Sequence, residues 1–69
     1  MMDRKEKTYV VAYITADHSV RKSSVEAFRR SDEQQAREYA KGILKTNSVA
    51  TGMFYVADDN AILISLGSI

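Results

Sequence analysis

Two segments of this chain are apolar on consecutive residues, and this constrains the fold more than any other feature. Residues 7–16 read KTYVVAYITA and residues 52–57 read GMFYVA. Their β-branched and aromatic content is typical of strands. A strand with one face in water would instead alternate apolar with polar residues. The sequence therefore predicts a sheet with two apolar faces, of which a single helix covers one and a partner covers the other.

The small size of the chain makes such a partner more important. A domain of 69 residues buries only about 60% of its unfolded surface, so its core is marginal. Domains of this size are usually supported by disulfides, a metal or oligomerisation. There is no cysteine and there is one histidine, so we expect no disulfide, no metal site and no cofactor. Oligomerisation is the remaining way to stabilise a core of this size.

Charge alone does not predict a membrane or nucleic-acid partner for this chain. Ten basic and nine acidic side chains give a net charge of +1, which is too balanced to favour either kind of partner. No apolar run approaches the ~20 residues of a membrane-spanning helix. Residues 1–6 lack the apolar core of a signal peptide and are predicted to be a flexible leader. Residues 7–69 are predicted to form a single domain of a soluble, cytoplasmic protein.

The predicted elements follow the order β-β-α-β-β. Strands are predicted at residues 8–15, 20–30, 52–57 and 61–66, with turns at residues 16–19 and 58–60. In the second turn, Asn60 is predicted to take the left-handed conformation. The fold class is α+β: a four-stranded, largely antiparallel sheet with one helix packed on one face. The order of the strands within the sheet does not follow from the sequence.

The helix is the element with the clearest signals. It is predicted to begin after an N-cap at Ser31, with Gln34 completing a capping box, and to end at a left-handed C-cap at Asn47. Glu33 and Arg37 form a favourable i, i+4 pair. One buried stripe follows the helical period: Ala36, Tyr39, Ala40, Ile43 and Leu44.

The two faces of the sheet are assigned from the alternation along the strands. The helix is expected to cover Val10, Ala12, Ile14, Phe28, Phe54, Val56, Ile62, Ile64 and Leu66. The other face then carries Tyr9, Val11, Tyr13, Met53, Tyr55 and Leu63. A one-residue change of register would exchange the two sets, but one set would still lack a cover within the chain.

The tyrosine-rich face is the predicted protein interface. Tyrosine offers a large contact area, little entropy to lose and one polar tip. The alternative is that these tyrosines are simply good strand formers with solvated hydroxyls. The uncharged segment 61–66 gives a second route to association, because an uncharged edge strand can pair with a strand of another chain.

Two other functions are suggested by individual residues of the sequence. Asp17, His18 and Ser19 are the three residue types of a hydrolytic triad. Three adjacent residues in one turn cannot align as nucleophile, base and orienting group, so we expect no enzyme. The alternative function is RNA or DNA binding, with the sheet tyrosines stacking on bases. The phosphate contacts would come from Arg21, Lys22, Arg29 and Arg30. The sequence lacks the glycine-aromatic signature of RNA-binding sheets.

In size and element order, the chain looks like small accessory proteins of phages and mobile elements. The resemblance carries no individual residue across, and it implies a stoichiometric inhibitor or adaptor. Together with the excess apolar sheet surface, it predicts a non-enzymatic protein–protein interaction module. We expect a homodimer formed through the tyrosine face or the last strand, and a surface on a larger protein as the target.

Overall fold

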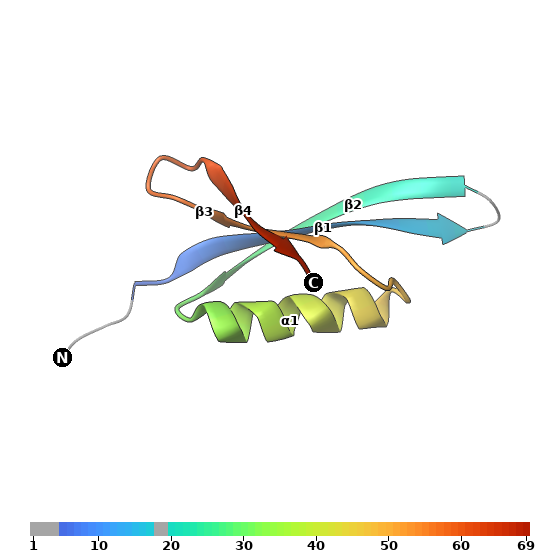
Figure 1. The fold of residues 1–69 in the computed structure, drawn as a ribbon, viewed down its shortest axis with the longest axis horizontal. Coiled ribbons are helices and arrows are strands. Elements are labelled where there is room, and N and C mark those ends of the chain that lie inside the picture. The colour runs from blue at the N-terminus through green and yellow to red at the C-terminus, as the bar shows by residue number, and fades with distance from the viewer. Residues whose placement is uncertain (1–4, 18–19) are drawn as a thin grey trace.

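The computed structural model describes residues 5–17 and 20–69 and shows one four-stranded sheet with one helix (Figure 1). In chain order the elements are β1 (Lys7–Asp17), β2 (Val20–Arg30), α1 (Glu33–Thr46), β3 (Met53–Ala57) and β4 (Leu63–Ser68). The predicted α+β class and element order are confirmed. Most of the predicted leader, and His18 and Ser19 of the predicted turn, lie outside the described residues.

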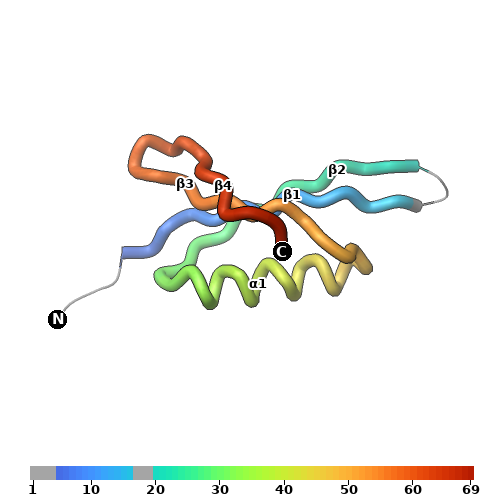
Figure 2. The backbone as a smooth tube through the Cα atoms, viewed as in Figure 1, coloured from blue at the N-terminus to red at the C-terminus, as the bar shows by residue number. Residues whose placement is uncertain are grey.

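All strand pairs are antiparallel, and their order is β2-β1-β3-β4. The strands β1 and β3 are therefore central, while β2 and β4 form the edges. The hairpin of β1 and β2 is paired along its whole length, from Lys7 opposite Arg30 to Asp17 opposite Val20. In contrast, β3 pairs with β1 only between residues 9 and 12. Residues 13–17 and 20–24 thus extend beyond β3 as a two-stranded arm (Figures 1 and 2).

The helix begins one residue later than predicted. Asp32, not Ser31, is the N-cap, and its Oδ1 accepts a hydrogen bond from the Gln34 N–H at 3.3 Å. A carboxylate there both caps a free N–H group and meets the positive end of the helix dipole. At the other end Asn47 is the C-cap, as predicted, but its φ of −95° is not left-handed. The left-handed residue is Ser48, with φ of 57°.

The helix α1 lies along one face of the sheet (Figure 1), and the core residues come from these two layers. The core consists of Tyr9, Val11, Tyr13, Ala36, Ala40, Leu44 and Phe54, with Phe28, Ile43, Val49, Val56, Leu66 and Ile69 packed around it. Three of the five predicted stripe residues of α1 are buried, and Ile43 is half-buried. Tyr39 is exposed, although its ring meets Phe28 edge-on with centroids 4.7 Å apart. The predicted Glu33–Arg37 ion pair is present at 3.2 Å.

The connection between β3 and β4 is longer than the predicted three-residue turn. Asp58 Oδ1 accepts hydrogen bonds from the N–H groups of Asn60 and Ile62 at 2.8 and 2.9 Å. The left-handed residue is Ala61, with φ of 62°, not Asn60. The strand β4 consequently starts at Leu63 and continues past the predicted end at residue 66.

Candidate protein interface

The sheet face opposite α1 is apolar along its middle, and no other element of the described chain covers it. Register and alternation place there Val10, Ala12, Ile14, Val25, Ala27, Met53, Tyr55 and Leu63, which we call the open face. Ile14, Val25, Met53 and Leu63 are 56, 67, 42 and 50% exposed. Contiguous exposed apolar side chains are typical of interaction sites.

Charged strand residues on this face lie at its two ends, among the positions that the structure describes. Arg29 lies opposite Thr8 at one end, and Arg21 lies opposite Ala16 at the other. The Nε atom of Arg29 is 3.9 Å from Oε1 of Glu6, an exposed pair that contributes little to stability. An apolar centre with a polar rim is the usual arrangement of a protein interface.

The predicted membership of the open face is wrong for β1. Tyr9, Val11 and Tyr13 lie on the opposite face and are buried beneath α1. The residues predicted from the other strands do lie on the open face: Met53, Tyr55 and Leu63. From β1 the even-numbered residues take part instead. Because β1 is apolar at every position between residues 9 and 14, its sequence contains no alternation that says which set faces the helix.

The helix itself contained the signal that identifies the covered set. Ala36 and Ala40 are fully buried, so α1 approaches the sheet closely with little side-chain volume of its own. The sheet must fill the space, since interiors are packed to crystal-like density. Tyr9 and Phe54 do so, with ring planes 7° apart and centroids separated by 5.6 Å. Matching small helix residues to the largest sheet residues would have selected the tyrosines of β1 over Ala12.

A hydrogen bond holds one of these buried tyrosines. The hydroxyl of Tyr13 donates to Oε2 of Glu26 at 2.7 Å. This bond to a carboxylate, with burial as a lesser cause, raises the pKa of Tyr13 above its ordinary value. Burial is the main cause that raises the pKa of Tyr9, and the charges of Glu33 and Asp32 add to it. Folding therefore favours the neutral phenol at both positions.

We expect the free energy of unfolding to fall as pH rises above about 10, the ordinary pKa of tyrosine. The stabilisation is complete below the unfolded-state pKa and is lost as pH rises through the higher folded-state pKa, because the unfolded chain loses these protons first. Urea unfolding midpoints between pH 7 and pH 11 measure this. The decline should be shallower in a Tyr13→Phe variant, and an equally steep decline there would contradict the assignment.

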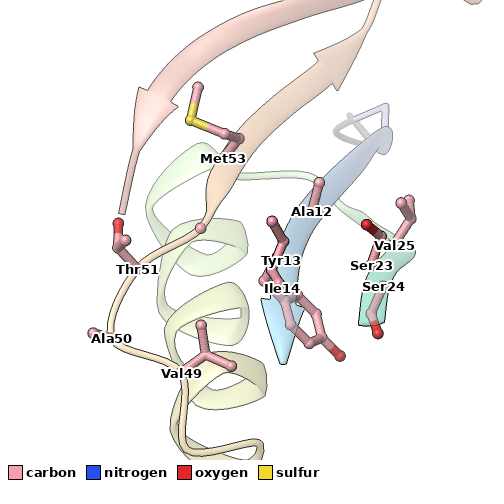
Figure 3. Close-up of a pocket in the computed structure, with 11 residues that line it drawn as sticks. Ala12, Tyr13, Ile14, Ser23, Ser24, Val25, Val49, Ala50, Thr51 and Met53 are labelled. Atoms are coloured by element: carbon pink, nitrogen blue, oxygen red, sulfur yellow. The ribbon is translucent and has the colours of Figure 1, made fainter. Parts of the chain in front are cut away.

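An apolar hollow of about 550 Å³ lies where the arm leaves β3 (Figure 3). One wall is the connection between α1 and β3, with Val49, Ala50 and Thr51. The other wall is formed by Tyr13, Ile14, Ser23 and Ser24 of the arm, and by Val25, which follows the arm in β2. The hollow joins the open face at Ala12, Ile14, Val25 and Met53. Sequence reasoning missed it, because it depends on where β3 ends relative to β1.

The structure separates the residues that were predicted to contact phosphates. Arg21 and Arg29 are on the open face of β2, and Lys22 and Arg30 are on the other. The eight-residue spacing of Arg21 and Arg29 corresponds to roughly 27 Å along a strand. The guanidinium carbon of Arg30 lies 4.3 Å from the ring centroid of Tyr39, on the helix side. With the tyrosines of β1 buried as well, stacking rings and basic side chains do not converge on one surface.

The described residues, 5–17 and 20–69, contain no cluster of three histidine, aspartate or glutamate side chains that could hold a metal ion. The same residues include no helix that is long and apolar enough to cross a membrane. Comparison with protein-family models, curated proteins and solved structures gives no match to this chain. The open face and the hollow are therefore characterised by their geometry alone.

Proposed function

We propose that this protein is a non-enzymatic protein–protein interaction module. It forms a homodimer and acts as a small inhibitor or adaptor by occupying a surface on a larger protein. The open face is the observation that carries this proposal. Four large apolar side chains from four different strands point away from the only core that the described residues form. A surface of this kind is stabilised by contact with another macromolecule.

The energy available from the open face favours association but does not fix a tight complex. Full burial of a valine, leucine, isoleucine or methionine side chain contributes about 1.5–3 kcal/mol, and the four here are about half exposed. Together they supply on the order of 3–5 kcal/mol. Association itself costs at least about 4 kcal/mol. Backbone hydrogen bonds or further contacts must therefore supply the rest of the binding free energy.

Nucleic-acid binding is not supported by any observation on the structure. That alternative required exposed tyrosines beside basic side chains. Tyr9 and Tyr13 are buried in the core beneath α1. Tyr55 is half-buried on the open face, away from Lys22 and Arg30 on the other side of the sheet. Protein binding needs no such convergence, so it remains the better account.

Native mass is the first test of the proposal. Sedimentation equilibrium or light scattering should give a mass that approaches twice the 7.7 kDa of one chain as the protein concentration rises. A single-chain mass at every concentration would contradict the homodimer.

The role of the open face has its own test. A Met53→Asp variant places a charge on that face, and Val20→Asp places one at a 65% exposed position on the other side of the sheet. The two variants are matched, because neither buries the new charge. A larger protein that binds the Val20→Asp variant but not the Met53→Asp variant supports the proposal. Equal retention by both variants contradicts it.

A further inference from the structure

The first strand of the arm has one side that no strand of the described chain occupies. Beyond Ala12, β1 remains paired with β2, but β3 has turned away towards the loop that follows α1. Isolated two-stranded ribbons are marginally stable in water, and they normally gain a third strand or a helix. Beyond Tyr13, which packs beneath α1, the arm has neither: Ile14 and Val20 are 56 and 65% exposed.

The backbone of the arm directs hydrogen-bonding groups into this space. A Cβ atom built on Gly52 would lie 2.9 Å from the carbonyl oxygen of Ala12, so this oxygen points towards the β3 side. Both backbone groups of a strand residue point to the same side, and the direction alternates. Ile14 and Ala16 therefore present their N–H and C=O groups to the side that β3 leaves unoccupied, and Ile14 lines the hollow there. No loop backbone hydrogen bond of the described chain reaches either residue.

The sequence of this edge suits pairing with a copy of itself. Residues 13–16 carry no charged side chain. In an antiparallel pair centred on Thr15, Asp17 lies opposite Tyr13 of the second copy, so no like charges are opposed. The outer edge strand β2 carries Arg21, Lys22, Glu26, Arg29 and Arg30, which protect it from such pairing. An antiparallel strand paired with its own copy is related to it by a two-fold axis, which closes the assembly at two chains.

We propose that the homodimer forms by antiparallel pairing of the arm edges, residues 13–17 of one copy with residues 13–17 of the second copy. This inference rests on the homodimer proposed above and assigns its contact. A two-fold axis near Thr15, perpendicular to the sheet, places each arm in the hollow of the other copy and in line with its β3. Both open faces then lie on one side and both helices on the other. The larger protein would meet one continuous, doubled open face.

The edge of β4 is a weaker candidate for the same contact. Its pairing with β3 changes register between Met53 and Tyr55, which pair with Ser68 and Ser65. Gly67, which lies between these two residues of β4, has φ of 91°. A bulge of this kind bends and twists the edge strand, which disfavours extension of the sheet. Between the loop and the bulge, only residues 63–65 are regularly paired. The arm offers five consecutive residues without a bulge.

The size of the contact predicts a weak dimer. Five paired residues extend over roughly 17 Å. The hollow adds a lining of 11 residues on each copy, whereas a standard interface has about 20–30 residues a side. We therefore expect a dimer that dissociates on dilution through the micromolar range.

An Ile14→Pro variant tests the backbone contact directly. Proline removes the N–H group that points into the hollow and is tolerated where that group has no partner in the sheet. Two such hydrogen bonds are lost in each dimer, which corresponds to about a thirtyfold weaker dissociation constant. Ile14→Thr keeps the N–H group and is the control. Sedimentation at several concentrations measures both, and far-UV circular dichroism reports whether each variant is folded.

Cross-linking gives a second test that does not depend on proline. The chain has no cysteine, so a Thr15→Cys variant carries one thiol, placed at the centre of the paired segment. Ser65→Cys on β4 is the control. Rapid oxidation of Thr15→Cys to a covalent dimer, with slow oxidation of Ser65→Cys, is the expected result. Faster oxidation of Ser65→Cys would overturn the arm contact in favour of β4.

The remaining outcomes separate this inference from the proposed function. A two-chain mass that persists in Ile14→Pro but is lost in Met53→Asp would overturn the arm contact and indicate packing of the two open faces. The homodimer itself would stand in that case. A single-chain mass for the unmodified protein at every concentration would overturn both proposals.

Discussion

Replacing Phe54 with alanine should lower the free energy of unfolding by about 3–5 kcal/mol. Phe54 is fully buried, its ring stacks on Tyr9 with centroids 5.6 Å apart, and the guanidinium carbon of Arg37 lies 5.1 Å from its centroid. A domain of this size has a total stability of roughly 3–10 kcal/mol. The variant is therefore expected to be largely unfolded at 37 °C.

Urea unfolding followed by circular dichroism measures this loss, and thermal unfolding provides a second estimate if the variant has no folded baseline. Ile62→Ala is the matched control, because Ile62 is 60% exposed in the loop before β4. Its effect should stay within about 0.5 kcal/mol. A loss below about 1 kcal/mol for Phe54→Ala would contradict a core built on this ring, since cavity formation alone costs more.

Two glycines should respond to alanine in opposite directions. At Gly52, the new Cβ would lie 2.9 Å from the carbonyl oxygen of Ala12 and 3.0 Å from Cδ2 of Leu44. The carbonyl belongs to the central strand and cannot move away without disturbing the pairing of β1 with β3, so we expect a destabilisation of about 1–3 kcal/mol. At Gly42, in the exposed part of α1, nothing lies within 4 Å of the new Cβ. Alanine there should stabilise the protein by about 1 kcal/mol, through helix propensity.

The difference between Gly52→Ala and Gly42→Ala is the quantity to measure, because any systematic error of the unfolding assay affects both equally. Urea midpoints at one protein concentration are sufficient, provided that the slopes agree. Two variants of equal stability would mean that the close approach of Gly52 to Ala12 is relieved by a small backbone shift. Gly52→Val would then separate the cases, since a branched side chain needs more space than such a shift provides.

Local signals were enough to predict the elements and their class. The helix follows from its periodic stripe and its caps, and the strands follow from β-branched and aromatic residues between turn residues. The predicted element boundaries are wrong where a side chain accepts hydrogen bonds from the backbone. The carboxylate of Asp58 holds the N–H groups of Asn60 and Ile62, and this extends the turn and delays β4. The left-handed residues, Ser48 and Ala61, each come one position after the predicted asparagine.

The candidate site could be predicted less well, because it depends on contacts between distant segments. That one sheet face lacks a cover followed from the number of apolar strand residues against a single helix. Which residues of β1 belong to that face depended on the packing of Ala36 and Ala40 against Tyr9 and Phe54. The hollow depended on strand order and on the short overlap of β3 with β1, neither of which has a local sequence signal.

The strand order also determines the sequence of events during folding. The hairpins β1–β2 and β3–β4 join neighbouring segments, and such hairpins form within about 1–10 μs. The pairing of Tyr9 with Val56 joins residues that are 47 positions apart in the sequence, so closing the sheet requires a long loop and is slower. Until β3 pairs, β1 has one unpaired side along its length, and residues 8–16 of that strand carry no charge. A nascent chain on the ribosome has this unpaired strand edge from the moment β2 emerges until β3 has emerged. Chaperone binding during that interval would protect the edge from association with other chains.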